Sequence, residues 1–309
     1  MPELPEVETT TRGLRKTILG LTIKDVWTDL STKDKRQKDA VANPKFFSLF
    51  KKEILNKKVL SVERRAKNIL INISGDKTIL VHLKMTGHLL YGKYKFTKNK
   101  WIPSETGALN DPYNRFVHVI FTFLPRRSRA TGFGETHLAF SDARKFGKIT
   151  LLDTKTAHDT KHLNNIGPEP LLKKFNLQKF KEVLYKKPNG KIKTVLMDQS
   201  IIAGIGNIYS DEILWRTGIN PERKVSKIKD GEFKLMFKAL KETLAKGIDF
   251  GGDSMSDYRN IHGLPGKFQL HHEAYRRTGE KCHKKGCKGI ILRKIVNGRS
   301  AHFCSVHQL

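Results

Sequence analysis

The chain of 309 residues has few acidic side chains: 30 Asp and Glu stand against 59 Lys and Arg, which gives a formal net charge of +29. A charge of this size attracts polyanions, and nucleic acid is the most common of these. Cysteine is scarce too, because the three cysteines all lie within the last thirty residues, and an odd number cannot pair completely. We therefore expect a reducing environment and a metal site rather than a disulfide framework.

Long apolar runs are absent from the sequence, and its first residues are acidic rather than the basic start of a signal peptide. We therefore expect no membrane span and no membrane partner, and a cytoplasmic location. Hydrophobic residues make up 38% of the chain, which together with its length is enough for two modest cores. A ribosome-associated protein, or a merely soluble basic protein, would show the same composition.

The first eight residues carry the most informative chemistry. Met1 precedes a small residue, and its removal would leave Pro2 with a free secondary amine. An α-amino group titrates near ~8 against ~10.4 for lysine, so much more of it is unprotonated at neutral pH. Its attack on a carbonyl carbon gives an iminium, which is an electron sink as lysine Schiff bases are. Glu3 and Glu6 share one face if this stretch is helical, which places nucleophile and acid/base side by side. The alternative is a capped surface helix whose Pro and Glu only mark its start.

Short apolar runs with alternation follow the first helix and predict a β-sandwich or barrel. They cover residues 21–27, 59–62, 68–73, 78–83 and 116–121. Two basic stretches, at 93–115 and 126–137, interrupt them and are expected to be loop insertions between strands.

The second half of the chain has a helical pattern. The prolines around residues 167–170 predict a linker, and apolar residues recur at helical spacing over 173–185 and 233–244. Gly204 and Gly206 do not form a dinucleotide-binding motif, because the third glycine is missing and a helix precedes them. Two glycines before a helix still expose backbone N–H groups to a phosphate.

A metal site is predicted near the C-terminus. Thiolates and imidazole suit tetrahedral zinc, and the candidate ligands are Cys282, Cys287, Cys304 and His307. Between the two pairs, Asn297 and Gly298 separate two apolar runs, which is a strong hairpin signal, and Arg299 follows its tip. His283 or His302 could compete as the fourth ligand, and a metal-free hairpin is the alternative.

Several of these stretches resemble the formamidopyrimidine/endonuclease VIII family of DNA glycosylases. Residues 1–9 resemble the opening of its formamidopyrimidine-DNA glycosylase branch, which Leu4 favours over the other branch. Further motifs resemble the family at residues 82–87, 142–147 and 193–214 and in the zinc finger. Departures are Ala143, Lys145, the wider spacing of the first cysteine pair, and His307 where the family has cysteine.

The resemblance implies an α+β fold of two domains. An N-terminal β-sandwich with a catalytic N-terminal helix is expected over residues 1–152, followed by a linker over 153–176. A helix-two-turns-helix domain with a lesion-recognition loop is expected over 177–266, and a β-hairpin zinc finger holding one structural Zn²⁺ over 267–309.

The function implied is that of a bifunctional DNA glycosylase and AP lyase of base excision repair. Oxidised purines such as 8-oxoguanine and formamidopyrimidines would be removed through a Schiff base on Pro2, with β,δ-elimination. Glu3 would move protons, Glu6 would support the site, and Lys67 would grip a phosphate beside the lesion. The DNA contacts implied are His82, Lys193 and Asn207 on phosphates, Met85 in the hole left by the everted nucleotide, Arg144 on the orphaned base, Phe146 as a wedge, and Arg299 in a minor groove.

Double-stranded damaged DNA is the expected partner, bound in a basic cleft between the domains by a monomer associated with the nucleoid. Two other functions fit the same residues. One is an endonuclease VIII-like glycosylase for oxidised pyrimidines, and the other is a non-catalytic protein of the same fold that binds damaged DNA.

Overall fold

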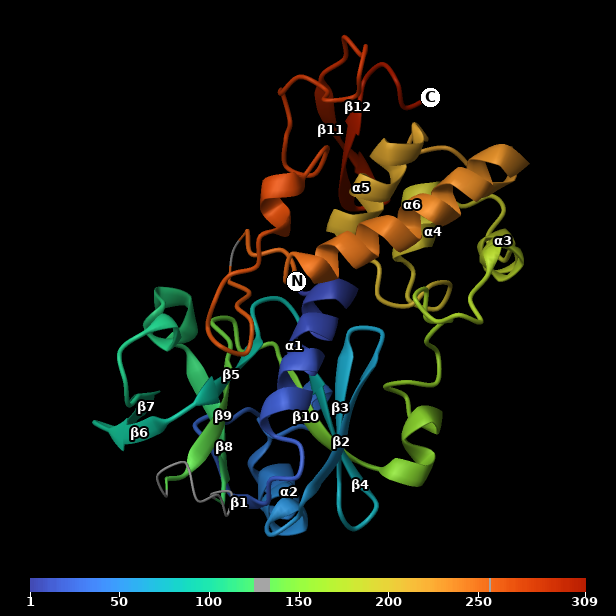
Figure 1. Cartoon of the computed structure of the whole chain (residues 1–309). Helices are drawn as coiled ribbons and strands as arrows, with labels where there is room; N and C mark the ends of the chain where they lie inside the picture. Colours follow the sequence, from blue (N-terminus) through green and yellow to red (C-terminus); the bar gives the residue numbers. More distant parts are fainter. Residues whose placement is uncertain (125–133, 256) are drawn as a thin grey trace. The chain divides into compact units, whose positions relative to one another are not determined.

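A computed structural model describes residues 1–124, 134–255 and 257–309 (Figure 1). The chain divides into two compact units. The first contains Met1–Leu163 and Gly251–Lys267, and the second contains Asn164–Phe250 and Phe268–Leu309. Most of the basic stretch expected at 126–137 lies outside the described residues. In the described part of the chain, no helix is long and apolar enough to cross a membrane.

The first unit contains two four-stranded antiparallel sheets among its described residues. One sheet has the order β1 (Ile23–Thr28), β8 (Val117–Phe123), β9 (Thr136–Ser141) and β5 (His88–Gly92). The other has the order β10 (Lys148–Asp153), β4 (Lys77–His82), β3 (Asn68–Ile73) and β2 (Val59–Arg65). The helices α1 (Leu4–Thr17) and α2 (Pro44–Ile54) complete this unit, together with 3-10 turns that include η1 (Lys35–Gln37) and η4 (Thr154–Asp159).

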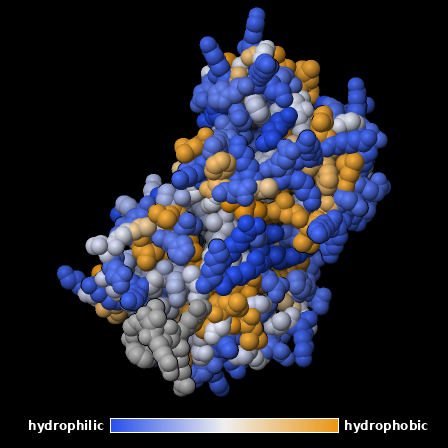
Figure 2. All heavy atoms as spheres, in the orientation of Figure 1, coloured by the Kyte–Doolittle hydropathy of each residue, from blue (hydrophilic) through white to orange (hydrophobic). Residues whose placement is uncertain are grey.

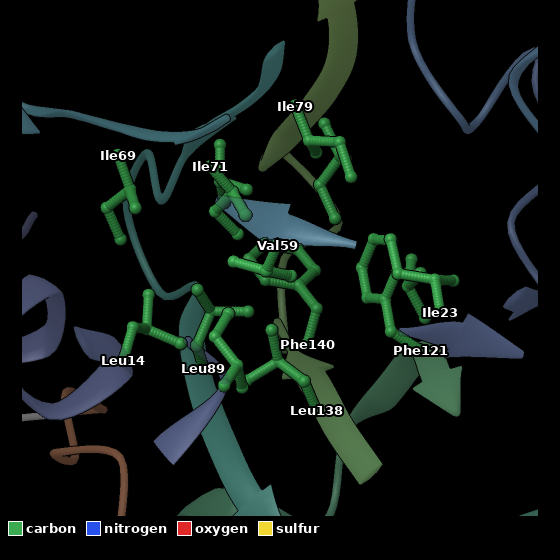
Figure 3. Close-up of a cluster of buried hydrophobic side chains, with 14 of the residues drawn as sticks. Leu14, Ile23, Val59, Ile69, Ile71, Ile79, Leu89, Phe121, Leu138 and Phe140 are labelled. Atoms are coloured by element: carbon green, nitrogen blue, oxygen red, sulfur yellow. The ribbon is translucent and has the colours of Figure 1, made fainter. Parts of the chain in front are cut away.

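The core of the first unit lies where the apolar faces of its sheets and of α1 meet (Figure 3). Phe121 and Phe140 come from one sheet, Ile71 comes from the other, and Leu14 comes from α1. Each is nearly inaccessible to solvent, and complete burial of such a side chain contributes about 1.5–3 kcal/mol. The predicted β-sandwich is therefore confirmed, with the N-terminal helix packed against β2.

The sequence that begins α1 explains why the helix starts where it does. Glu3 is the extended N-cap residue, and its backbone N–H donates to Glu6 Oε2 at 2.7 Å, which is half of a capping box. Pro5 lies in the first turn, where its missing N–H is not needed. Leu4 and Val7 are fully buried. The start of the chain is thereby held against the sandwich rather than left in solvent.

Two features of the first unit differ from the expectation. The stretch 93–115 is not a plain loop, because β6 (Tyr94–Thr97) and β7 (Lys100–Pro103) form a hairpin. It is anchored by Trp101, whose ring lies 6.3 Å from that of Trp27. The helix α2 was not predicted, although Asn43 caps it and Phe50 and Ile54 recur at helical spacing.

The second unit is mainly helical, with α3 (Leu177–Tyr185), α4 (Ile192–Met197), α5 (Asn207–Thr217) and α6 (Asp230–Asp249). Its two-stranded sheet pairs β11 (Ile291–Val296) with β12 (Arg299–Cys304) around the predicted Asn297–Gly298 turn. Both turn residues have positive φ, +47° and +75°, as this tight hairpin requires. Hydrophilic side chains cover most of the face of the molecule in Figure 2, in line with the excess of lysine and arginine.

One segment groups differently from the predicted domain boundaries. Residues 251–266 were predicted to belong to the helical domain and residue 267 to the zinc finger, whereas the segment 251–267 groups with the compact unit of the N-terminal residues. The physical reason is a set of hydrogen bonds from this segment to α1, described below. The remaining predicted boundaries stay a prediction about functional domains.

Candidate functional sites

The start of α1 forms a buried carboxylate site beside Pro2. Pro2 is buried, and Glu3 and Glu6 are 2% and 1% exposed. Glu6 Oε2 accepts from the N–H of Glu3, and Glu6 Oε1 accepts from the N–H of Asp253 at 2.7 Å. Because each oxygen of Glu6 receives a backbone N–H, its carboxylate is fixed in place.

The loop that reaches this carboxylate is shaped for close approach. Gly252 has a φ of +88°, and a Cβ added there would lie 2.9 Å from Glu6 Cγ. Tyr258 donates its hydroxyl to the backbone carbonyl of Glu6 at 3.0 Å, and burial raises the pKa of this hydroxyl, so it remains a donor. The segment 251–267 is thus bound to the first turn of α1 at both the side chain and the backbone.

The turn carrying Lys67 is joined to the same helix by Arg64. Arg64 Nε donates to Glu8 at 2.8 Å, and another guanidinium nitrogen donates to the carbonyl of Ala66 at 3.1 Å. Burial would raise the pKa of Glu8, but hydrogen bonds from Arg64 and Arg12 outweigh it and hold this pKa below its usual range. Lys67 is 5% exposed in this turn. This role of Arg64 was not predicted, although Arg64 and Lys67 belong to the same basic run of the sequence.

His82, at the end of β4, is a neutral side chain. Burial, with the nearby charges of Lys84 and Lys67, lowers the pKa of His82 to about 3. Its Nδ1 accepts the backbone N–H of Lys84 at 3.0 Å. The ring proton therefore sits on Nε2, which is left to donate one hydrogen bond outward.

Three side chains expected to enter DNA come from two turns that Asp142 joins. Asp142 is fully buried and accepts hydrogen bonds from the Thr86 hydroxyl and from the N–H groups of Arg144 and Gly147. It thereby ties the turn after β4 to the turn before β10. The sequence analysis quoted this aspartate within its motif but did not foresee its connecting role.

The exposed ends of these turns carry the predicted side chains. Met85 is 41% exposed and Phe146 is 49% exposed, which is unusual for large apolar residues. The guanidinium of Arg144 lies over the Phe146 ring, 4.7 Å from its centroid. Exposed apolar side chains with a guanidinium beside one of them are suited to insertion between bases.

The helix-two-turns-helix motif of the second unit is organised by Gln199. Its amide nitrogen donates to the carbonyls of Met197 and Ile205, and its amide oxygen accepts the N–H of Gly204 at 2.9 Å. Asn207 follows as the first residue of α5, preceded by Gly206. The predicted candidate Asn207 therefore lies at the positive end of a helix, where a phosphate is stabilised.

Lys193 lies in a buried environment with polar partners. It is 0% exposed, and its Nζ lies 2.6 Å from Asp211 Oδ1 and 3.2 Å from Ser210 Oγ. Asp211 Oδ2 in turn accepts from the N–H of His302 at 3.0 Å. Lys193 is therefore a buried ion-pair partner that links α4 to α5, and its contact with a DNA phosphate stays a prediction.

The four predicted metal ligands lie together at the end of the hairpin. One ligand atom from each of Cys282, Cys287, Cys304 and His307 lies within 4.8 Å of the others. Cys287 Sγ is 3.5 Å from Cys304 Sγ, and His307 Nδ1 is 3.4 Å from Cys282 Sγ. Zinc–ligand bonds of about 2.0–2.3 Å in a tetrahedron give edges of roughly 3.6–3.8 Å, so this set fits such an ion.

The competing histidines have other partners. His283 lies against Arg277 and Glu273, and His302 against Asp211. His307 Nε2 lies 2.9 Å from the backbone oxygen of Trp215, which orients Nδ1 toward the sulfurs. Arg299, the last predicted DNA contact, is exposed at the start of β12.

The fold and the sites together define a basic two-domain α+β protein. It has a proline at position 2 followed by two buried glutamates, a helix-two-turns-helix motif and a Cys3His cluster. Residues 1–149 match the formamidopyrimidine-DNA glycosylase N-terminal domain, and residues 166–259 match the formamidopyrimidine-DNA glycosylase H2TH domain. The chain belongs to the formamidopyrimidine-DNA glycosylase family.

Individual relatives agree along the whole chain. The formamidopyrimidine-DNA glycosylase of Pelotomaculum thermopropionicum is 36% identical over 308 residues, which cover 100% of this chain and 99% of the relative. That of Bacillus subtilis is 34% identical over 306 residues, with coverage of 99% and 98%.

Solved structures of a relative are similar as well. The Lactococcus lactis protein in complex with DNA containing an abasic site has a TM-score of 0.79 and 32% identity, with 99% of each chain covered. A variant of it in complex with DNA containing Fapy-dG has a TM-score of 0.80, with the same identity and coverage.

Proposed function

We propose that this protein is a DNA glycosylase and AP lyase of base excision repair that removes oxidised purines through a Schiff base on Pro2. The observation that carries the proposal is the buried site at the start of α1, where Glu3 and Glu6 flank Pro2. Relatives similar over the full length have the glycosylase name, and one of them is known in complexes with abasic and Fapy-dG DNA.

The chemistry begins once Met1 is removed; Met1 is 49% exposed and thus accessible to an aminopeptidase. The lone pair of the Pro2 nitrogen forms a bond to C1′ of the damaged nucleotide while the glycosidic bond breaks and the base leaves with a proton. Glu3 is the group we assign to proton transfer, because it is buried next to the amine. Glu6, fixed by two backbone N–H groups, acts as a positioning residue.

Pro2 then loses its N–H proton, and the lone pair of its nitrogen forms the C1′=N bond as the C1′–O4′ bond breaks and O4′ takes up a proton, which opens the sugar ring. The resulting iminium makes the C2′ hydrogen acidic. Its loss expels the 3′ phosphate by β-elimination, and a second elimination expels the 5′ phosphate, so the strand is cut on both sides. No oxidant or metal is required for these steps. The sugar carbon is accessible only if the nucleotide is everted, since stacking otherwise covers it.

The DNA contacts follow from the exposed side chains. Met85 and Phe146 would fill the space in the stack, and Arg144 would face the orphaned base. Neutral His82 would donate Nε2–H to a phosphate, and Lys67 would hold the phosphate beside the lesion. On the second unit, Asn207 at the start of α5 and Arg299 at the hairpin tip are the proposed backbone contacts. The proposed partner is double-stranded damaged DNA; a monomeric state and a cytoplasmic, nucleoid-associated location stay predictions.

For the Cys3His cluster we propose one structural Zn²⁺ held by Cys282, Cys287, Cys304 and His307. Bound zinc would supply folding energy to the hairpin and no chemistry. The small apolar cluster around it contains only a few residues, including Trp215 and Ile291, so the hairpin depends on the additional cross-link.

The test is borohydride trapping on a duplex containing 8-oxoguanine, after intact-mass measurement has established that Met1 is absent. The wild type is expected to form a covalent adduct and to nick the strand. Pro2→Gly with its amine blocked is expected to form none, whereas Pro5→Ala keeps the nucleophile and should still be trapped. Wild-type protein that binds the duplex without adduct or nick would leave only a damaged-DNA-binding protein.

Lesion class is tested separately by comparing turnover on 8-oxoguanine, formamidopyrimidine and thymine glycol duplexes. Higher kcat/KM on the first two supports the purine assignment. Preference for thymine glycol would replace it with the endonuclease VIII-like function.

A further inference from the structure

A cavity in the first unit lies directly beside the turn that carries Arg144 and Phe146 and has no role in the function proposed so far. Its volume is about 800 Å³. Its lining includes Ser31, Thr32 and Gln37 from the segment after β1, together with Lys84, Lys145 and Lys148. All of its lining residues lie within the first unit.

The charge of the lining is strongly unbalanced. Five of the lining residues are lysine or arginine, namely Arg36, Lys84, Arg144, Lys145 and Lys148, against the two carboxylates Asp29 and Asp34. Both carboxylates already have cationic or histidine partners, since Asp29 lies 2.8 Å from His118 Nδ1 and Asp34 binds Arg36. Little negative charge therefore remains in the lining to balance Lys84, Lys145 and Lys148.

Two of these lysines differ from Lys148 in their partners. Among the residues that the structure describes, no carboxylate pairs with Lys84 or Lys145, whereas Lys148 lies 2.6 Å from Asp39. Partial desolvation and the positive charge of Lys148 lower the pKa of Lys84. An anion placed between these lysines would favour their charged forms.

The backbone conformation of Lys84 and Lys145 is also unusual. Lys84 and Lys145 both have positive φ, 56° and 55°, a conformation that costs a residue with a Cβ on the order of 1–2 kcal/mol. Lys84 directly precedes Met85, and Lys145 directly precedes Phe146; both of these neighbours are proposed DNA contacts. The strained turns therefore fix these two lysines relative to the side chains that enter the stack.

We propose that this cavity binds a backbone phosphate of the DNA strand opposite the lesion, held by Lys84 and Lys145. The inference rests on the proposed function and extends it to the second strand. Arg144 is the group proposed to face the orphaned base, so the strand that reaches a cavity bordered by Arg144 is the strand carrying that base. Two flexible ammonium groups without carboxylate partners suit a phosphate, which accepts hydrogen bonds from several directions.

The experiment measures Kd as a function of salt for a duplex with a tetrahydrofuran abasic analogue, which requires no turnover. Loss of one phosphate contact lowers the slope of log K against log salt by about 0.9. We expect that decrease for the double variant Lys84→Gln/Lys145→Gln. Lys98→Gln is the matched control, because Lys98 also has positive φ, 47°, in the first unit but does not line the cavity.

Neutral methylphosphonates placed one at a time identify the strand. On the opposite strand, one position is expected to weaken the wild type and to have no further effect in the double variant. Lys145→Arg keeps the positive charge and should therefore keep the wild-type salt slope. This comparison separates loss of charge from loss of fold. An unchanged slope in the double variant, or coupling only to phosphates of the lesion strand, would overturn the inference.

The failure of the proposed function has a different signature. Wild-type protein that binds the abasic analogue no more tightly than undamaged duplex, and gives no borohydride adduct, would remove the function itself. Lesion preference and adduct formation with an unchanged slope in Lys84→Gln/Lys145→Gln would remove only the phosphate site.

Discussion

The carboxylate of Glu6 accepts a hydrogen bond from the backbone N–H of Asp253, 247 residues further along the chain, at 2.7 Å. The same carboxylate accepts the N–H of Glu3 through its other oxygen. A single side chain thus connects the start of the chain with the loop at residues 251–267. Through Glu6, the position of that loop and the position of the proposed nucleophile Pro2 depend on each other.

Glu6→Gln tests this connection. A glutamine can accept only one of the two N–H bonds and places an NH2 group against the other backbone N–H. We expect a loss of about 1–3 kcal/mol in the free energy of unfolding and slower borohydride trapping. Denaturant unfolding and trapping rates provide the measurements.

Glu105→Gln, in the exposed insertion of the same unit, is the control and should change neither quantity. If Glu6→Gln retains full stability but loses trapping completely, Glu6 itself takes part in proton transfer, and its assignment as a positioning residue would have to be given up.

The buried pair Lys193 and Asp211 leads to a second prediction. Removing one member of a buried ion pair costs about 3–5 kcal/mol, because the other charge is left uncompensated. We therefore expect Lys193→Met to lower the free energy of unfolding by this amount. The salt slope of DNA binding by the folded variant should be unchanged, since the side chain is 0% exposed.

Arg299→Gln should behave in the opposite way. This residue is exposed at the hairpin tip, so stability should change by less than about 0.5 kcal/mol while the salt slope falls by about 0.9. A reduced slope in folded Lys193→Met would mean that the lysine leaves its pocket to bind DNA.

Local sequence patterns predicted the elements whose causes are local. Alternating apolar residues gave the strands of the sandwich, and Asn297–Gly298 gave the hairpin turn. The spacing of Cys282, Cys287, Cys304 and His307 identified a cluster that the fold brings together. Alternation, turn chemistry and ligand spacing each act over a few residues, which is why a sequence displays them.

Features created by tertiary contacts were not predictable in the same way. Lys193 was predicted to contact a phosphate, and nothing near it in the sequence shows that α5 brings Asp211 to 2.6 Å. The grouping of residues 251–267 with the first unit depends on the distant bond to Glu6. The helix α2 was detectable from its cap at Asn43, but its single buried stripe of Phe50 and Ile54 is short.

The environment of His82 leads to a prediction about pH. Its pKa is about 3 in the folded state, below the usual value of 6.5, so between these values the unfolded chain binds one more proton than the folded one. Stability therefore falls as pH decreases below about 6.5, by up to about 1.4 kcal/mol per pH unit from this residue. His82→Gln should flatten the stability profile between pH 6.5 and 4.5, as measured by urea unfolding.

DNA binding should be insensitive to the same residue's titration. Because His82 stays neutral, the salt slope of the wild type should be the same at pH 6 and pH 8. A steeper slope at pH 6 that disappears in His82→Gln would show that the histidine carries charge on the DNA.

The last prediction concerns His307 and the metal. The wild type should bind one Zn²⁺, and its cobalt-substituted form should show the absorption of tetrahedral thiolate coordination. His307→Ala should weaken zinc binding by more than the roughly 10–100-fold typical of losing a second-shell partner, and it should lower the thermal stability of the hairpin unit. His307→Cys restores a fourth ligand and should regain zinc, although the bond from Nε2 to the Trp215 carbonyl is lost.

The matched control is His283→Ala, because His283 lies next to Cys282 but contacts Arg277 and Glu273 instead of the cluster. If His283→Ala loses zinc and His307→Ala keeps it, the ligand assignment is wrong, and the wider first cysteine spacing would then serve to bring His283 to the ion.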